Sequence, residues 1–376
     1  MKNNKRLFIP VALIMAVLMF NGERAFSQEN NSKTLKEVFK GDFVVGTALN
    51  NWQINKTDKV MDSLITNQFN AITAENVMKS EEIHPKWGEF HFEDADKFVE
   101  YGKQNNMYIV GHTMVWHSQL PDFVHAITDP DSLRQFMDMH IKAVGERYAS
   151  SIDSWDVVNE ALNEDGTLRE SIFYKLLGED YIVEAFKKAA VAAPKAALYY
   201  NDYNIEQPKK RAGVIRLIKK LQEAGVRIDG IGIQGHWNIN DLDLKVIEES
   251  IQEYAKLGMK VAFTELDLSV LPNPWDMQGA DVNQNFEGGK DMNPYPDQLP
   301  DSVGAVLADK YEQLFNLFLK YRDDVSRVTL WGVSDRMTWL NNFPIRGRTN
   351  YPLLFDRNNQ PKEAFNRLIN IKNNSK

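Results

Sequence analysis

The 376-residue chain contains no cysteine. This absence excludes a disulfide framework and a lipid anchor attached to cysteine. Histidine is also scarce, with seven copies and no His-Glu-x-x-His motif, so we expect neither a catalytic metal nor another cofactor. The sequence has no Gly-x-Ser-x-Gly elbow either, which counts against an esterase.

Positive charge is sparse after the first 27 residues, where no run of Lys or Arg forms a basic stripe. The whole chain has a formal net charge of −8, and residues 1–27 hold four basic groups and one acidic group, so the remainder carries about −11. This balance makes nucleic acid an unexpected partner. A neutral or cationic substrate is easier to reconcile with the charge.

Long apolar runs are few, and the clearest one lies at the start of the chain. Basic residues precede an apolar stretch from Leu7 to Phe20, and Ala25-Phe26-Ser27 then offers small residues at a cleavage site. This layout predicts a secretory signal peptide over residues 1–27 and a periplasmic or secreted protein, with an uncleaved anchor as the alternative. The stretch is too short for a membrane span, so we expect a mature chain without stable membrane association, and a monomer.

Short β-rich runs recur along residues 28–376, with helical stretches between them. They are nearly continuous apolar runs, which is typical of parallel strands covered on both faces. The pattern predicts a single-domain α/β protein with a (β/α)8 TIM-barrel fold, and a doubly wound open sheet is the runner-up. The eight predicted strands are Phe43–Leu49, Phe69–Asn76, Tyr108–Trp116, Ser154–Ala161, Ala197–Asn204, Gly230–Trp237, Lys260–Asp267 and Arg327–Asp335.

Apolar residues at helical spacing, together with Pro and Gly near the helix ends, predict the intervening helices. One connection differs from the rest, because residues 272–304 after the seventh strand are rich in Pro, Gly, Asn and Asp. Loops of this length are uncommon unless they are functional or disordered. The predicted helices are 131–149, 208–224, 244–257, 307–322 and 362–371.

Polar and aromatic residues accumulate at the ends of the predicted strands, where a barrel of this kind places its active site. Such a lining suits a sugar, because aromatic faces stack on the C–H faces of a pyranose and polar groups bind the hydroxyls. Glu160 and Glu265 end the fourth and seventh runs, and a carboxylate is costly to bury unless its site uses it. Two such carboxylates suggest the acid and the nucleophile of glycoside hydrolysis.

Several motifs at these strand ends together resemble glycoside hydrolase family 10, the endo-β-1,4-xylanases. The resemblance extends from about residue 43 to residue 366. The matching motifs are Ala74-Glu-Asn-Val-Met-Lys79, Gly111-His-Thr-Met-Val-Trp-His-Ser-Gln-Leu-Pro121, Trp155–Ala161, Asn201–Asn204, Gly230–His236, Thr264–Asp267, Leu330–Asp335 and Pro352-Leu-Leu-Phe-Asp356.

The resemblance implies a retaining enzyme that cleaves internal bonds of xylan through a covalent glycosyl-enzyme intermediate. It implies that Glu160 is the acid/base, that Glu265 is the nucleophile, and that Asp267 supports His236 behind the nucleophile. Xylan and xylo-oligosaccharides are the implied partners. The implied substrate-binding residues are Glu75, Asn76, Lys79, His112, Trp116, Asn159, Tyr203, Gln234, His236, Trp331 and Trp339.

Two other functions stay open at the level of sequence. One is a non-catalytic barrel that binds xylan, which the presence of both carboxylates disfavours. The other is a related retaining β-1,4-glycanase that prefers another polysaccharide. A dinucleotide-binding reading of Gly230-Ile-Gly-Ile-Gln-Gly235 is disfavoured, because this motif lies inside a predicted strand and not at a strand-to-helix turn.

Overall fold

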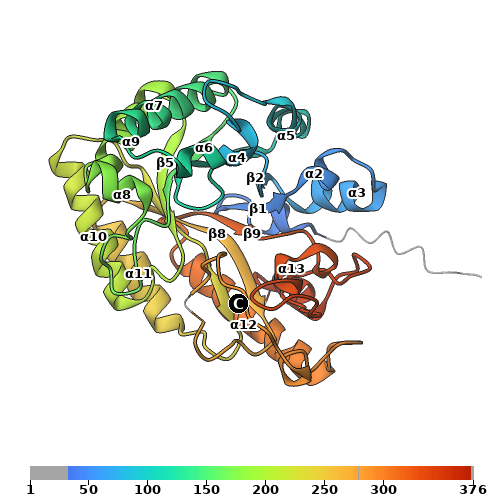
Figure 1. Cartoon of the computed structure of the whole chain (residues 1–376). Coiled ribbons are helices and arrows are strands. Elements are labelled where there is room, and N and C mark those ends of the chain that lie inside the picture. Colours follow the sequence, from blue (N-terminus) through green and yellow to red (C-terminus); the bar gives the residue numbers. More distant parts are fainter. Residues whose placement is uncertain (1–32, 278, 374–376) are drawn as a thin grey trace, which may run out of the picture. The chain divides into compact units, whose positions relative to one another are not determined.

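The computed structural model describes residues 33–277 and 279–373, and the described part from Thr34 onward forms one compact unit. Within it a parallel sheet closes into a barrel with helices on the outside (Figure 1). The predicted (β/α)8 fold is therefore confirmed. The predicted signal peptide, residues 1–27, lies outside the described residues. No helix among the described residues is long and apolar enough to cross a bilayer.

Strands β1 to β6 pair in parallel with one another in sequence order. Strand β6 then pairs with β8, β8 with β9, and β9 with β1, which closes the ring. Each of the eight overlaps its predicted run. Most positions on these strands are buried, which explains their nearly continuous apolar sequences. The strands are β1 Val44–Leu49, β2 Ala71–Ala74, β3 Tyr108–Trp116, β4 Ser154–Asn159, β5 Ala197–Asp202, β6 Gly230–Ile233, β8 Lys260–Ser269 and β9 Val325–Leu330.

The sixth predicted strand is interrupted, and the interruption matters for the site. Gly235 has φ +81°, a conformation that glycine adopts without steric cost, and it separates β6 from a short extra strand, β7 His236–Asn238. Strand β7 pairs with the end of β8, with His236 opposite Asp267. The break therefore carries His236 to the mouth of the barrel beside β8.

The longer helices cover the outside of the barrel, and some of them begin at a side-chain cap. Helix α7 starts with Pro130 after Asp129, whose carboxylate accepts from Ser132 N. The α-helices are α1 Leu35–Val38, α2 Asn51–Ile54, α3 Lys59–Gln68, α4 Ser80–Ile83, α5 Glu93–Gln104, α6 Asp122–His125, α7 Pro130–Arg147, α8 Ile172–Leu177, α9 Tyr181–Ala192, α10 Pro208–Glu223, α11 Leu244–Lys256, α12 Asp301–Lys320 and α13 Glu363–Asn370. Short 3₁₀ turns are η1 Lys290–Met292, η2 Asp335–Met337 and η3 Trp339–Asn341.

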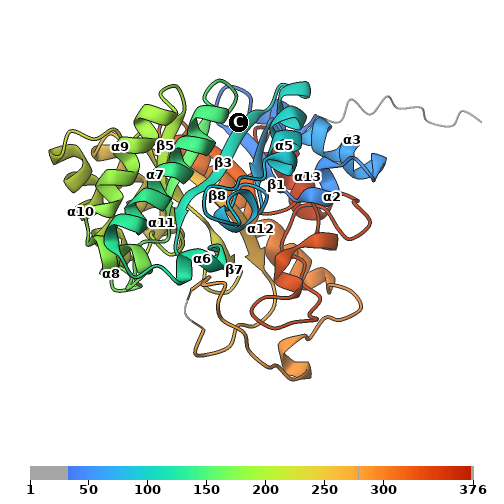
Figure 2. The same ribbon diagram turned by 45° about the horizontal axis from the view of Figure 1, so that its top comes forward.

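Two predicted boundaries differ most from the structure. Helix α12 begins at Asp301, six residues before the predicted start at 307. The predicted start was late because none of residues 301–306 is buried, so the apolar spacing becomes clear only from Leu307. The long connection therefore spans 270–300, and Figure 2 shows it in yellow to orange, looping out beyond β7. Strand β9 ends at Leu330, so Asp335 lies in η2.

Candidate active site

One cavity at the C-terminal ends of the barrel strands contains both candidate carboxylates. Every predicted substrate-binding residue except Tyr203 lines this cavity, so strand ends that are far apart in sequence converge as expected. Within the described residues, no cluster of His, Asp or Glu has the arrangement of a metal site. The lining residues are Glu75, Asn76, Lys79, His112, Trp116, Gln119, Asn159, Glu160, Gln234, His236, Glu265, Ala280, Val282, Trp331 and Trp339.

Glu160 follows the last residue of β4 and has φ +56°, which is unusual for a residue with a side chain. Its backbone N–H donates to Asn201 O at 2.9 Å, which continues the pairing of β4 with β5 past the end of the strand. Its carboxylate accepts from Trp116 Nε1 at 2.9 Å and from Gln234 Nε2 at 2.9 Å. The backbone turn and the two donors together aim the buried carboxylate into the cavity.

Glu265 lies on β8 and is held by a chain of polar groups behind it. Its Oε2 lies 3.1 Å from His236 Nε2, and the other ring nitrogen of His236 lies 3.1 Å from Asp267 Oδ1. Asp267 also accepts from Trp339 Nε1 at 2.8 Å. The imidazole thus lies between two carboxylates and can donate to both only when it is protonated.

Asn201, at the end of β5, connects the two candidate carboxylates. Its amide Nδ2 donates to Glu265 Oε1 at 2.8 Å and to Asn159 Oδ1 at 2.9 Å. A carboxylate can only accept, so the contact with Glu265 fixes which end of the Asn201 amide faces the site. The hydroxyl of Thr264 completes the arrangement by donating to Asn201 Oδ1 at 2.6 Å.

Burial raises the pKa of the Glu160 carboxyl to about 7, and the negative charges of Asp202 and Glu265 act in the same direction. The hydrogen bonds from Gln234 and Trp116 favour the ionised form and oppose this rise. A carboxyl with a pKa near 7 can both give and take a proton near neutral pH.

The environment of Glu265 has the opposite net effect. Burial favours its neutral form, but the hydrogen bond from His236 and the charge of His112 outweigh burial and hold the pKa of Glu265 below its ordinary value. Burial lowers the pKa of His236, whereas the adjacent Asp267 and Glu265 outweigh it and raise that pKa to about 10. The site therefore pairs an ionised Glu265 with a Glu160 that is protonated below about pH 7.

One side of the cavity is built around a buried lysine. Lys79 Nζ donates to Asn76 Oδ1 at 2.8 Å and to Gln119 Oε1 at 2.7 Å, and it lies 4.9 Å from the centre of the Trp116 ring. Burial lowers the pKa of Lys79, although Glu265 and Glu75 oppose that effect. These donors and acceptors are suited to binding the hydroxyl groups of a sugar.

Aromatic rings close the cavity on the side of β9. The Trp331 ring makes edge-on contacts with His112 at 5.7 Å and with His236 at 6.2 Å between ring centres. Trp339 lies 4.8 Å from His236 and stacks on Phe343 at 4.4 Å. The predicted aromatic wall is therefore present.

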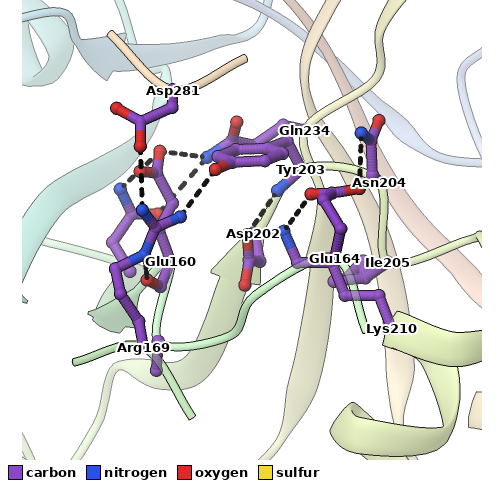
Figure 3. A network of polar contacts seen from close by, with 12 residues as sticks. Glu160, Glu164, Arg169, Asp202, Tyr203, Asn204, Ile205, Lys210, Gln234 and Asp281 are labelled. Atoms are coloured by element: carbon purple, nitrogen blue, oxygen red, sulfur yellow. Dashed lines mark hydrogen bonds and ion pairs between the residues drawn. The ribbon is translucent and has the colours of Figure 1, made fainter. Parts of the chain in front are cut away.

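Tyr203 is placed differently from the other predicted residues. Its ring is buried, and its hydroxyl accepts from Arg169 Nη2 at 2.6 Å (Figure 3). Lys210 Nζ lies 3.7 Å from the centre of the ring, and Gly279 approaches so closely that an added Cβ would lie 2.5 Å from the ring. Tyr203 therefore supports the cavity from behind, and its contact with substrate stays a prediction.

Arg169 was not predicted as a site residue from the sequence, although its side chain contacts the Glu160 backbone. Its Nε donates to Glu160 O at 3.1 Å, and its Nη1 pairs with Asp281 at 2.8 Å, across 112 residues of sequence (Figure 3). Asp281 belongs to the long connection after β8. No local pattern signals a pair between two loops. Gln119 and Asn201 were also missed as site residues, although both stand in the motifs that carry the resemblance.

Comparison with known proteins agrees with this geometry. The model of glycosyl hydrolase family 10 matches residues 34–371. Endo-1,4-beta-xylanase A of Xylanibacter ruminicola is 42% identical over 348 residues, which cover 91% of this chain and 94% of that relative. Beta-1,4-xylanase of Dictyoglomus thermophilum is 40% identical over 371 residues, with 97% and 99% covered.

Comparison with solved structures points to the same family. A novel GH10 endoxylanase retrieved from a sugarcane soil metagenome superposes with a TM-score of 0.87 at 45% identity, covering 90% of this chain and 99% of that one. A family model that spans nearly the whole described chain and relatives at this identity agree with the motifs at the strand ends. The chain belongs to glycosyl hydrolase family 10.

Proposed function

We propose that this protein is a retaining endo-β-1,4-xylanase, with Glu160 as the acid/base and Glu265 as the nucleophile. The observation that carries the proposal is that two buried carboxyl groups line one cavity, in surroundings that raise the pKa of Glu160 and lower the pKa of Glu265. Paired titratable groups whose environments separate their pKa values are typical of an acid and a base with distinct roles. The curated relatives named above are xylanases.

In the first step, the ionised Glu265 attacks the anomeric carbon while protonated Glu160 gives its proton to the leaving oxygen. His236 and Asn201 hold the two oxygens of Glu265, so the carboxylate does not have to be ordered during the reaction. The glycosidic bond breaks, and an ester forms between Glu265 and the sugar.

In the second step, Glu160 changes from acid to base. Formation of the ester removes the negative charge of Glu265, which is one of the charges that raises the pKa of Glu160. Glu160 then takes a proton from water, and the water oxygen attacks the anomeric carbon from the side that the leaving group vacated. The ester bond to Glu265 breaks, which returns Glu265 to its ionised form and leaves Glu160 protonated for the next cycle. The product keeps the configuration of the substrate.

The overall reaction is tested by following products on xylan, cellulose and mannan, with the anomer of the new reducing end recorded by NMR. We expect the fastest turnover on xylan, internal cleavage, and the β-anomer as first product. Binding of xylan without release of reducing sugar would favour the non-catalytic barrel. Faster turnover on cellulose or mannan would favour the glycanase with another substrate, and an initial α-anomer would exclude retention.

The residue roles are tested by two substitutions. Glu265→Gln should abolish turnover while the fold survives, and substantial residual activity would show that the nucleophile is another residue. Glu160→Ala should spare aryl β-xylobiosides with good leaving groups more than xylan, because such leaving groups need less protonation. Equal losses on both substrates would contradict the acid role.

We also propose that the enzyme acts outside the cytoplasm, in the periplasm or as a secreted protein, and as a monomer. The support for export is the basic and apolar layout of residues 1–27. Fractionation of the native host, together with determination of the N-terminus of the mature protein, tests this. A mature N-terminus at Met1 in the cytosolic fraction would contradict export.

A further inference from the structure

The catalytic cavity continues into a second one on the side of Asn204. The two cavities share His236, Ala280 and Trp339 in their walls, and the second is larger, about 310 Å³ against about 160 Å³. Glu75 and Lys79 line only the first cavity. The cleft therefore has its larger volume on the side away from Glu75 and Lys79. We place the leaving part of the substrate on this side, because Asn204 follows Tyr203, whose hydroxyl shares Arg169 with the acid Glu160.

An exposed tryptophan stands in a stretch of chain that contributes to the wall of the second cavity. Asn273, Pro274 and Met277 line this cavity, and Trp275 stands between them with 95% of its surface exposed. Among the described tryptophans the next most exposed is Trp87, at 45%. A fully exposed indole beside a polar cleft is a typical binding group, since it offers a large rigid face at low entropic cost.

The short stretch with Trp275 is fixed on both sides. On one side, Arg348 Nη1 donates to Pro272 O at 2.9 Å. On the other, Asp281 pairs with Arg169 at 2.8 Å. The indole is thus presented from a stretch whose flanks are tied to the rest of the barrel, so a ligand does not have to order the whole connection in order to stack there.

The chemistry of the second cavity limits what can reach Trp275. Its lining includes Glu206, Asp241 and Asp267 but contains no Lys or Arg. One oxygen of the buried Glu206 accepts from Trp237 Nε1 at 3.0 Å, so this acidic group is part of the cavity wall. A wall of this kind disfavours an anionic ligand and accepts a neutral polyol.

We propose that Trp275 is a stacking platform for a neutral xylosyl unit of the leaving part of the chain, beyond the units held in the second cavity. The inference rests on the proposed function, because it takes xylan as the polymer that lies along the cleft. The platform contributes only when the substrate is long enough to reach it. It therefore favours long chains over short ones and has no part in the chemical step.

The experiment compares kcat/KM on xylohexaose with kcat/KM on an aryl β-xylobioside, whose leaving group is too short to reach the platform. Trp275→Ala should lower the ratio by about three- to tenfold, which is the range expected for loss of one stacked aromatic contact. Trp275→Phe should keep most of the ratio. The matched control is Trp87→Ala, which removes another exposed indole and should leave the ratio unchanged.

An unchanged ratio in Trp275→Ala would overturn the platform, and so would a parallel fall on both substrates, because that result would show a general structural role. An equal fall in Trp87→Ala would overturn it as well. These results are separate from failure of the proposed function, in which the unsubstituted enzyme itself would not cleave xylohexaose.

Discussion

The hydrogen bond from the Trp116 indole to Glu160 makes a prediction about the pH dependence of the enzyme. The substitution Trp116→Phe keeps an aromatic ring beside the cavity and removes the N–H that donates to Glu160 Oε2 at 2.9 Å. This donor stabilises the ionised carboxylate, so its presence lowers the pKa of Glu160. Removing it should therefore raise that pKa above its value of about 7.

The size of the effect follows from the strength of the bond. Hydrogen bonds to charged groups contribute about 1.5–3 kcal/mol, and one pKa unit corresponds to about 1.4 kcal/mol. Loss of the indole donor should shift the pKa of Glu160 upward by about one to two units. Gln234 still donates to the other oxygen, so the carboxylate is not left without a partner.

The assay is the pH profile of kcat/KM on xylo-oligosaccharides. Its basic limb reports the pKa of the essential acid in the free enzyme. We expect a basic limb near pH 7 in the unsubstituted enzyme and a limb about one to two units higher in Trp116→Phe. Trp331→Phe is the matched control, because no hydrogen bond joins Trp331 to either carboxylate in the described structure, and its limb should stay in place even if the rate falls.

A basic limb that stays in place or moves down in Trp116→Phe would refute the reasoning. A downward shift has a specific meaning, because it would show that water enters the vacated space and relieves the burial of Glu160. Burial would then control the protonation of the acid more strongly than the indole donor does.

Two further predictions concern the long connection and acid stability. Asp281→Asn removes the ion pair with Arg169 and should lower the ratio of kcat/KM on xylohexaose to kcat/KM on the aryl xylobioside. Asp291→Asn, at an exposed position in the same connection, should leave this ratio unchanged. Equal ratios in the two variants would show that the pair of Asp281 with Arg169 does not anchor the connection. Burial lowers the pKa of His140 to about 3, while an unfolded histidine titrates near 6.5, so this group costs stability as pH falls below about 6.5. His140→Leu removes this group and leaves the stacked His84 in place. It should therefore shift the midpoint of acid unfolding, recorded by circular dichroism, to lower pH. An unshifted midpoint would show that other groups dominate acid unfolding.

Periodicity and strand-end chemistry account for most of what could be predicted from the sequence. The strand ends were informative because parallel strands of a barrel bring their carboxyl ends together. Glu160 and Glu265 could therefore be assigned to one site, although they lie 105 residues apart in sequence. The bounds of elements without a complete apolar stripe were harder to predict. None of residues 301–306 at the start of α12 is buried, so the helix was predicted to begin too late.

Contacts between loops could not be predicted, because they depend on the three-dimensional path of each connection. Arg169 lies in the loop after β4 and shows no local pattern, yet it touches the backbone of Glu160, the hydroxyl of Tyr203 and the carboxylate of Asp281. Tyr203 illustrates the same limit. Its place in a motif was evident, but its burial under Gly279 depends on the fold of a segment far along the chain.

The pairing of Arg169 with Asp281 also has a consequence for protein engineering. Exchanging only the connection after β8 with that of a relative would leave Arg169 partly buried without its carboxylate, beside the backbone of Glu160. Breaking a partly buried pair in this way is costly, because the remaining charge keeps its desolvation penalty. A chimera should therefore inherit both loops from the same parent, as a single transplantable unit.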